Sequence, residues 1–402
     1  MAFLQPSVIQ SKIEIINGKI FKNFDPYSFV SPSAYDTAWL AMIPDPEKPS
    51  QPMFKICLDW VLNNQHGEGF WGECDAFGKP TIESLLATLA SMIALKKWNS
   101  GDWMIEIGLA FIEANSGKLL KNMKDYCPPC WFAIMFPAMV ELAETVGLRI
   151  VFPGTVETVS YICSCRNIIL QKEKLVGKQC YPPLLSYLEA LPPSYAVSEE
   201  DISTNLSDDG SLFQCPSATA KAFMATKKPE CLAYLQSLIH RCPNGVPQSY
   251  PMDEDLIKLS MVNHLQRLGL AEKFKEEIKE IMEKIYRNYI KEVSWVKPTN
   301  MIEPQLQKDA LAFQLLRMHG YEISPLSLCW FLHLQEIRAH VEKDYECFTL
   351  AILNIYRASN LMFYGEYELE EARSFSRILL EKTTQAGQWN HNEFSRLHKL
   401  VN

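Results

Sequence analysis

The stretch AEKFKEEIKEIMEKIYRNYI, residues 271–290, decides the fold class. Its apolar side chains return every three or four positions, so they line one face of a helix, while Glu and Lys residues occupy the opposite face. The apolar face comprises Phe274, Ile278, Ile281, Met282, Ile285 and Tyr289. The pattern predicts a surface helix packed on a core.

The helical period recurs along the chain. It is present in residues 82–98 and in residues 136–145, where Gly147 follows as a left-handed C-terminal residue. Alternating runs of strand type are nearly absent. Prolines interrupt the pattern at intervals that hold one or two helices each, at 44–52, 128/129, 182/183, 192/193 and 298. The sequence therefore predicts an all-α fold built from serial helical hairpins, as in an α/α barrel or solenoid.

Composition limits the class of function. The chain has 402 residues, 48% of them hydrophobic, which suits two or three domains with sizeable cores. Its net charge of -8 is spread over interspersed Lys and Glu residues, which argues against a nucleic-acid partner. No apolar run approaches the roughly 20 residues that a membrane-spanning helix needs.

The first 22 residues mix isoleucines with Lys and Glu, unlike a signal or transit peptide, so we expect a cytoplasmic protein. Twelve cysteines in such a chain are expected to be reduced core residues. The pair Cys127/Cys130, followed by Cys163 and Cys165, leaves a zinc or redox site as the less favoured alternative.

Two segments share the order acid, glycine, aromatic. They are residues 65–72 and residues 207–213, and each precedes a helix. We interpret both as tight turns in which glycine takes a positive φ, the acid caps backbone N–H groups and the ring plugs the core. This interpretation makes them structural elements without chemistry.

Several motifs, taken in order, resemble the plant terpene synthase family. The segment Ser33-Ala-Tyr-Asp-Thr-Ala-Trp39 is similar to the family's N-terminal signature, and residues 65–72 to its Gln-x-x-x-Gly-x-Trp-Gly turn. Further matches follow in the family's order at 95–99, 245–251, 265–269, 315–321 and 355–359. The stretches 131–139, 181–191 and 329–340 look closer to geranyllinalool synthases than to kaurene or copalyl diphosphate synthases.

The resemblance implies a domain organisation. It predicts an α/α double barrel in which residues 51–269 form an inserted γ domain, and residues 1–50 and 270–402 supply part of a β domain. Family members are about twice as long, so the resemblance further predicts that the class I α domain is absent and that β is incomplete.

The resemblance also locates where catalytic acids would stand. Class II cyclases protonate a double bond with an Asp-x-Asp-Asp motif, which needs a neutral acid in an apolar pocket. Aligned on Ala310-Leu-Ala-Phe313, that motif falls on Gln305-Leu306-Gln307-Lys308. The histidine of copalyl diphosphate synthases falls on Ser186. We therefore expect no class II activity.

Class I synthases ionise an allylic diphosphate held by Mg²⁺ on an Asp-Asp-x-x-Asp helix. The 402 residues contain no such motif, and Asp208/Asp209 precedes a turn. The cluster Asp253-Glu-Asp255 is interpreted as a helix start, because acids there stabilise the N-terminus. We name no catalytic, cofactor-binding or metal-binding residue, and we expect His319, His333 and His340 to be ordinary helix residues.

Three functions remain open. Full-length relatives convert geranylgeranyl diphosphate to geranyllinalool by ionisation and water capture, in which case these residues are a scaffold that is inactive alone. Alternatively, the chain is a non-catalytic partner of full-length synthases. In the third interpretation, a repurposed γβ cavity binds an isoprenoid diphosphate through Gln305, Gln307 and Lys308.

Overall fold

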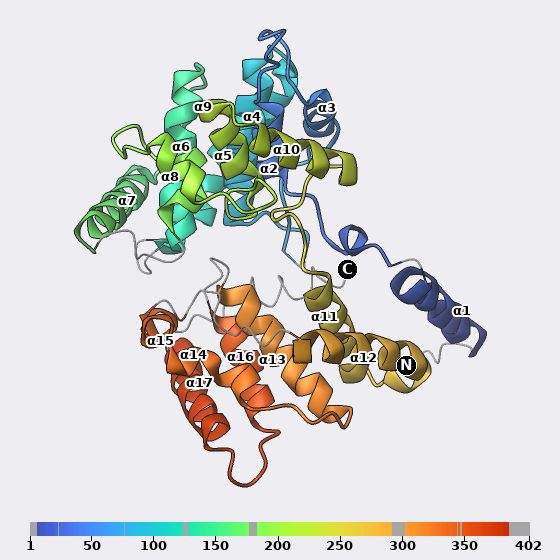
Figure 1. Ribbon diagram of the computed structural model, residues 1–402. Coiled ribbons are helices and arrows are strands. Elements are labelled where there is room, and N and C mark those ends of the chain that lie inside the picture. The colour runs from blue at the N-terminus through green and yellow to red at the C-terminus, as the bar shows by residue number, and fades with distance from the viewer. Residues whose placement is uncertain are drawn as a thin grey trace. The chain divides into compact units, whose positions relative to one another are not determined.

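A computed structural model describes residues 6–22, 24–75, 77–123, 128–176, 183–291, 302–343, 345 and 348–385. Over these residues the secondary structure is helical, with three isolated β-bridges and no strand. The all-α prediction is confirmed. Figure 1 shows the elements in chain order. The expected break at Pro298 and the first cysteine of the pair at 127 and 130 lie outside the described residues.

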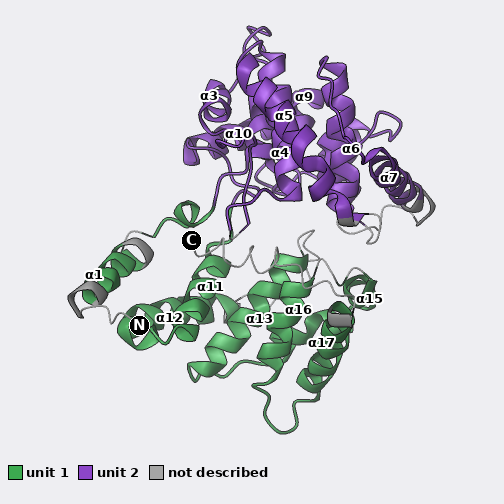
Figure 2. Cartoon of the chain, turned by 180° about the vertical axis from the view of Figure 1, so that it is seen from behind, with its two compact units in different colours: residues 1–30, 252–402 green, residues 31–251 purple. Residues whose placement is uncertain are grey.

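The chain divides into two compact units, coloured separately in Figure 2. Unit 2, residues 31–251, contains a first group of helices. They are α2 (Ala34–Ala41), α3 (Lys55–Asn63), α4 (Ile82–Lys97), α5 (Asp102–Leu119), η3 (Lys121–Met123), α6 (Cys130–Thr145), α7 (Val156–Val176), η4 (Leu184–Ala190), α8 (Glu199–Thr204), α9 (Pro216–Thr226) and α10 (Pro229–Arg241).

Unit 1 combines residues 1–30 with residues 252–402, so its two parts are far apart in sequence. Its elements are α1 (Pro6–Ile16), η1 (Asn17–Lys22), η2 (Pro26–Phe29), α11 (Glu254–Arg267), η5 (Ala271–Phe274), α12 (Lys275–Lys291), α13 (Ile302–Met318), α14 (Leu326–His333), α15 (Gln335–Lys343), α16 (Thr349–Ser359) and α17 (Tyr367–Gln385). Within this unit α13 packs against α11 and α16, and α16 packs against α17.

The predicted amphipathic helices form with small shifts at their ends. Residues 271–274 make a 3₁₀ turn before α12 begins, and Phe274, Ile278, Met282 and Ile285 are buried as the pattern requires. Helix α4 matches the predicted residues 82–98 to within one residue. Helix α6 starts earlier than predicted, at Cys130, and Gly147 follows it with φ +81°.

Both turns have the predicted glycine and aromatic geometry. Gly69 and Gly210 take φ +93° and +82°, and the rings of Phe70 and Phe213 are buried. The predicted cap by an acid is present in the second turn. Asp209 Oδ1 accepts from Ser211 N at 2.9 Å, so this acid caps the turn. A Cβ on Gly210 would lie 2.2 Å from the backbone oxygen of Glu230, a distance that only glycine allows.

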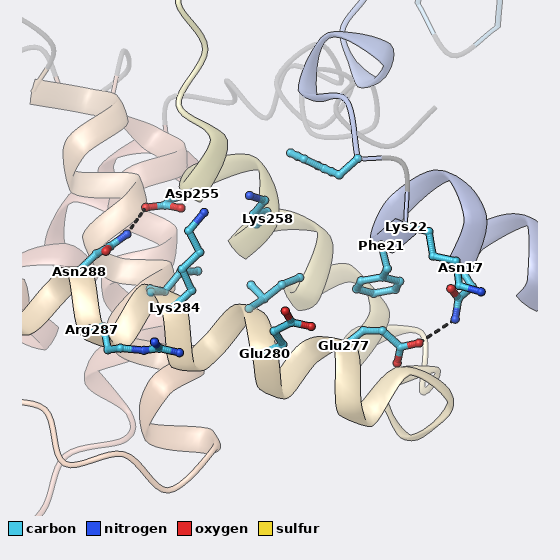
Figure 3. Close-up of a pocket in the computed structure, with 13 residues that line it drawn as sticks. Asn17, Phe21, Lys22, Asp255, Lys258, Glu277, Glu280, Lys284, Arg287 and Asn288 are labelled. Carbon is cyan, nitrogen blue, oxygen red and sulfur yellow. Dashed lines mark hydrogen bonds between the residues drawn. The ribbon is translucent and has the colours of Figure 1, made fainter.

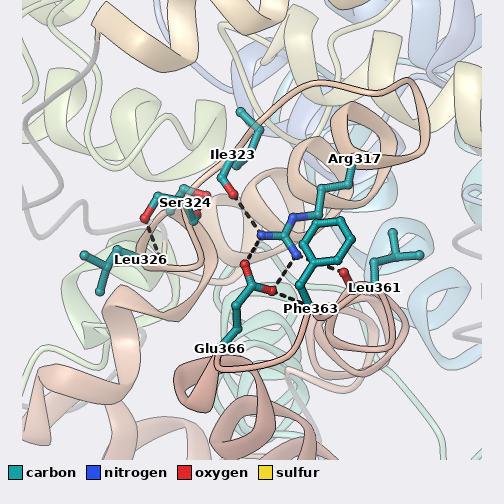
Figure 4. A network of polar contacts seen from close by, with 8 residues as sticks. Arg317, Ile323, Ser324, Leu326, Leu361, Phe363 and Glu366 are labelled. Atoms are coloured by element: carbon teal, nitrogen blue, oxygen red, sulfur yellow. Dashed lines mark hydrogen bonds and ion pairs between the residues drawn. The ribbon is translucent and has the colours of Figure 1, made fainter.

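One ion pair fixes the connection between α16 and α17 (Figure 4). Arg317, from the motif at 315–321, makes a two-pronged contact with Glu366 and donates to the backbone oxygens of Ile323 and Leu361 at 2.9 and 2.8 Å. The Phe363 ring covers its guanidinium, which lies 4.8 Å from the ring centre. The side chains of Arg317 and Glu366 are 6% and 17% exposed, so the contact lies in a largely dry environment.

Candidate functional site

Helix α13 carries the positions where class II cyclases have their acids. Leu306 and Gln307 are buried, and Gln305 Nε2 donates to Asp309 Oδ1 at 2.9 Å. Lys308 Nζ lies 3.0 Å from Asp253 Oδ2, and its side chain is 20% exposed. Each polar side chain predicted to line an isoprenoid cavity therefore either is buried or has a partner within unit 1.

Asp309 is a buried acid one residue beyond those positions. Its side chain is 2% exposed and accepts from three donors, namely Gln305, Trp330 Nε1 at 2.8 Å and the Tyr289 hydroxyl at 3.2 Å. Burial raises the pKa of Asp309 to about 6, although the three hydrogen bonds act in the opposite direction. Because its acceptors are filled, Asp309 holds α12, α13 and α14 together.

Asp309 was missed in the sequence, although a signal for it exists. Leu306, Asp309 and Phe313 occupy positions i, i+3 and i+7 on the buried face of α13. An acid on the buried face of an apolar period must find donors, so it indicates a buried polar network. The sequence cannot name those donors, since Tyr289 and Trp330 lie on other helices.

The acids after Pro251 form a helix start, as predicted. Asp253 precedes α11, and its Oδ1 accepts from Leu256 N at 3.0 Å. Asp255 lies in the first turn and accepts from Asn288 at 3.4 Å. Asp253 therefore has two tasks, because it caps α11 and also pairs with Lys308 on α13.

A second buried polar cluster lies in unit 2 and involves the motif at 33–39. Asp36 accepts from Ser33 Oγ at 2.6 Å and from Ser217 N at 3.1 Å. The Tyr35 hydroxyl donates to Glu189 Oε1 at 3.1 Å. Glu189 comes from the motif at 181–191, of which the structure describes residues 183–191, and it lies three residues after Ser186. Two of the family-like motifs thus meet at one cluster.

The acids of this cluster titrate unusually. Burial raises the pKa of Glu189 to about 8 and that of Asp36 to about 6. Glu189 Oε2 has no hydrogen-bond partner, and neither has the indole nitrogen of Trp39, which lies beside the Tyr35 hydroxyl without hydrogen-bonding geometry. At pH 7 Glu189 is therefore mainly protonated, whereas Asp36 is mainly ionised.

Unit 1 has an open cavity of about 630 Å³ lined by Asn17, Phe21, Lys22 and Phe24 on one side and by helices α11 and α12 on the other (Figure 3). Charges of both signs line it. Its acid Glu277 accepts from Asn17 at 2.7 Å, and its base Lys258 lies over the Phe24 ring. Such a lining selects no single class of ligand.

Metal-binding groups do not gather in the described ranges. There, no three His, Cys, Asp or Glu side chains are placed to hold a metal ion. His333 and His340 lie in helices α14 and α15, and His319 follows the last residue of α13. None of the helices in the described residues is long and apolar enough to cross a membrane.

Solved structures identify the fold. The chain superposes on ent-copalyl diphosphate synthase from Arabidopsis thaliana with a TM-score of 0.73 and 29% identity, over 94% of this chain and 53% of that one. Abietadiene synthase from Abies grandis gives 0.72 and 29%, over 94% and 49%. The fold is therefore that of the terpene synthases.

Sequence comparison gives the family. The profile of the terpene synthase N-terminal domain matches residues 200–402, and the chain belongs to this family. It is 47% identical over 383 residues to (E,E)-geranyllinalool synthase of Arabidopsis thaliana and 44% identical over 389 residues to S-linalool synthase of Clarkia breweri. These matches cover 90% and 93% of this chain but 43% and 45% of the relatives, so the chain spans less than half of their length.

Proposed function

We propose that the chain is the helical N-terminal part of a terpene synthase of geranyllinalool-type diterpenoid biosynthesis. The observation that carries the proposal is the 47% identity to (E,E)-geranyllinalool synthase over 90% of the chain. In this proposal, the whole protein ionises geranylgeranyl diphosphate and adds water to the cation. Mg²⁺ assists that ionisation and is bound outside residues 1–402, which contain no Asp-Asp-x-x-Asp.

Residues 1–402 alone are proposed to be a scaffold without ionising activity. The class II positions carry Gln305, Gln307 and Lys308, and none of these side chains is an acid that could protonate a double bond. Asp309, the nearest acid, is 2% exposed and has three donors. An acid held in this way is not available to a substrate.

The domain assignment belongs to the same proposal. We assign residues 51–269 to γ, and residues 1–50 and 270–402 to β. A cytoplasmic location is a further part of it, supported by the mixed composition of the first 22 residues. Fluorescence of a C-terminally tagged protein in plant cells tests the location, and a plastid signal would overturn it.

One observation favours a second candidate, a partner of full-length synthases. The connection between α16 and α17 exposes Phe363, Tyr364 and Tyr367, whereas soluble monomers bury most large aromatic side chains. The ion pair of Arg317 holds this connection in one conformation. A partner that covers these rings would lose little conformational entropy on binding.

The test is a chimera. Residues 1–402 replace the matching part of Arabidopsis (E,E)-geranyllinalool synthase, and the purified chimera is incubated with geranylgeranyl diphosphate and Mg²⁺. We expect geranyllinalool in the gas chromatogram from the chimera and none from residues 1–402 alone. Product from residues 1–402 alone would refute the scaffold assignment. A folded chimera without product would refute the family role.

A further inference from the structure

The cluster around Asp36 joins three segments that are far apart in sequence. Asp36 lies on α2, Glu189 on η4, and Ser217 in the first turn of α9. Helix α9 packs against both α2 and η4. The side chains of Asp36 and Glu189 are 3% and 7% exposed, so both carboxyls lie in the core of unit 2.

Hydrogen-bond donors are distributed unequally between the two carboxyls. Each oxygen of Asp36 has a donor, from Ser33 or from Ser217 N. Glu189 Oε1 accepts from the Tyr35 hydroxyl, and Oε2 is buried without a donor in hydrogen-bonding geometry, although the Ser217 side chain lies nearby. A buried carboxylate requires donors for its charge, so this arrangement suits an ionised Asp36 and a protonated Glu189.

No positive charge compensates the pair. Within the described part of unit 2, neither acid forms an ion pair with Lys, Arg or His. The other titratable groups that face the cluster are Tyr35 from α2, Cys215 before α9 and Tyr234 from α10. Burial raises the pKa of all three, so they are neutral wherever the two acids titrate.

We propose that a single proton, carried by Glu189 beside ionised Asp36, locks η4 onto α2 and α9, and that loss of this proton opens unit 2 at η4. Two adjacent carboxylates in a dry core without a cation repel each other and lose their hydration. Opening relieves both costs, because Glu189 then reaches water.

Thermodynamic linkage gives the direction in which pH changes the opening at η4. The pKa of Glu189 is about 8 in the folded protein and ordinary, 4.5, in the unfolded chain. The folded state therefore holds the proton more tightly, so the lock is complete below pH 4.5 and weakens as pH rises towards 8. Over that window the opening equilibrium increases by about tenfold per pH unit.

Hydrogen exchange of residues 184–191 tests the proposal in the intact chain. After correction for the intrinsic pH dependence of exchange, we expect protection of this peptide to fall by on the order of 100-fold between pH 6 and pH 8. Peptides from residues 102–119 in α5 should change far less. Equal changes in the two peptides of the wild-type protein would overturn the proposal, whatever the variants do.

Substitutions separate a proton lock from simple packing. Glu189→Gln keeps the shape of the protonated acid but cannot ionise, so protection of residues 184–191 should lose most of its pH dependence above pH 6, where only the end of the Asp36 titration remains. Its Tm should exceed that of the wild type by several °C at pH 9. Glu106→Gln, an exposed acid on α5, should behave as the wild type. If Glu189→Gln retains the pH dependence, Glu189 is not the group that carries the proton.

Discussion

Replacement of Arg317 by alanine tests how the α16–α17 connection is held. The change leaves the half-buried Glu366 without its cation and frees the backbone oxygens of Ile323 and Leu361. Breaking a fully buried ion pair costs about 3–5 kcal/mol and an exposed pair contributes about 0–1 kcal/mol, so we expect a cost of about 2–3 kcal/mol for this half-buried pair. Unit 1 has the size of an ordinary domain, for which that cost lowers Tm by roughly 4–12 °C.

The assay is hydrogen exchange of the peptides from α13 and α16, together with thermal unfolding of the full chain. Arg317→Lys should lie between wild type and alanine, because an ammonium keeps the charge but loses the planar two-pronged contact. Arg373→Ala, an exposed arginine on α17, is the matched control and should change stability little.

A double-mutant cycle isolates the pair. If Arg317 and Glu366 stabilise each other, the double variant Arg317→Ala/Glu366→Gln costs less than the sum of the two single changes, by about 1–3 kcal/mol. Additive costs, or an Arg317→Ala effect below about 1 kcal/mol, would refute the reasoning. The connection would then be held by contacts that do not need Arg317, such as the bond from Phe363 N to Glu366.

Three further outcomes are expected. Because the pKa of Asp309 is raised from 3.8 to about 6, its contribution to the stability of unit 1 decreases by about 2 kcal/mol as pH rises from 4 to 7. In Asp309→Asn, exchange of α13 peptides should lose that pH slope, and an unchanged slope would exclude Asp309 as its source. Gly210→Ala should cost about 2–4 kcal/mol in denaturant unfolding, because the added Cβ would overlap a backbone oxygen. Gly269 also has a positive φ but open space around it, so Gly269→Ala should cost about 1 kcal/mol. Asp253→Ala should lower the protection of α11 against hydrogen exchange by about 1–2 kcal/mol. Asp253→Ser should restore the helix cap but not the ion pair with Lys308. Equal losses in both variants would show that the ion pair matters and the cap does not.

Local periodicity was enough to predict the fold class, because each helix face is encoded by neighbouring residues. Residues 82–98 and 271–290 both gave helices, and on the predicted face of the second one Phe274, Ile278, Met282 and Ile285 are buried whereas Ile281 and Tyr289 are half-buried. Helix ends were less predictable. The first turn at Ala271 is 3₁₀, and α6 begins six residues before Phe136, because capping and tertiary packing decide the terminal turns.

The partners of buried polar groups could not be predicted. The motif at 33–39 was evident as a family-like segment, but nothing local shows that Tyr35 meets Glu189, 154 residues later. The same limit applies to Arg317 and Glu366. Such pairs depend on which helices become neighbours, and helical periodicity does not carry that information.

On α13, side chains stand at the aligned positions of the acid motif without having its chemistry. Alignment placed Gln305, Gln307 and Lys308 where an acid motif would stand, and from residue types alone Lys308 could have met a diphosphate. In the structure Lys308 pairs with Asp253, the cap of α11, and Gln305 donates to Asp309. A diphosphate would have to displace Asp253 from Lys308 and compete with the favourable geometry of that pair. Of the side chains at the acid positions, Lys308 therefore joins α11 to α13 and Gln305 supports Asp309 within α13, contacts that agree with the proposed scaffold role.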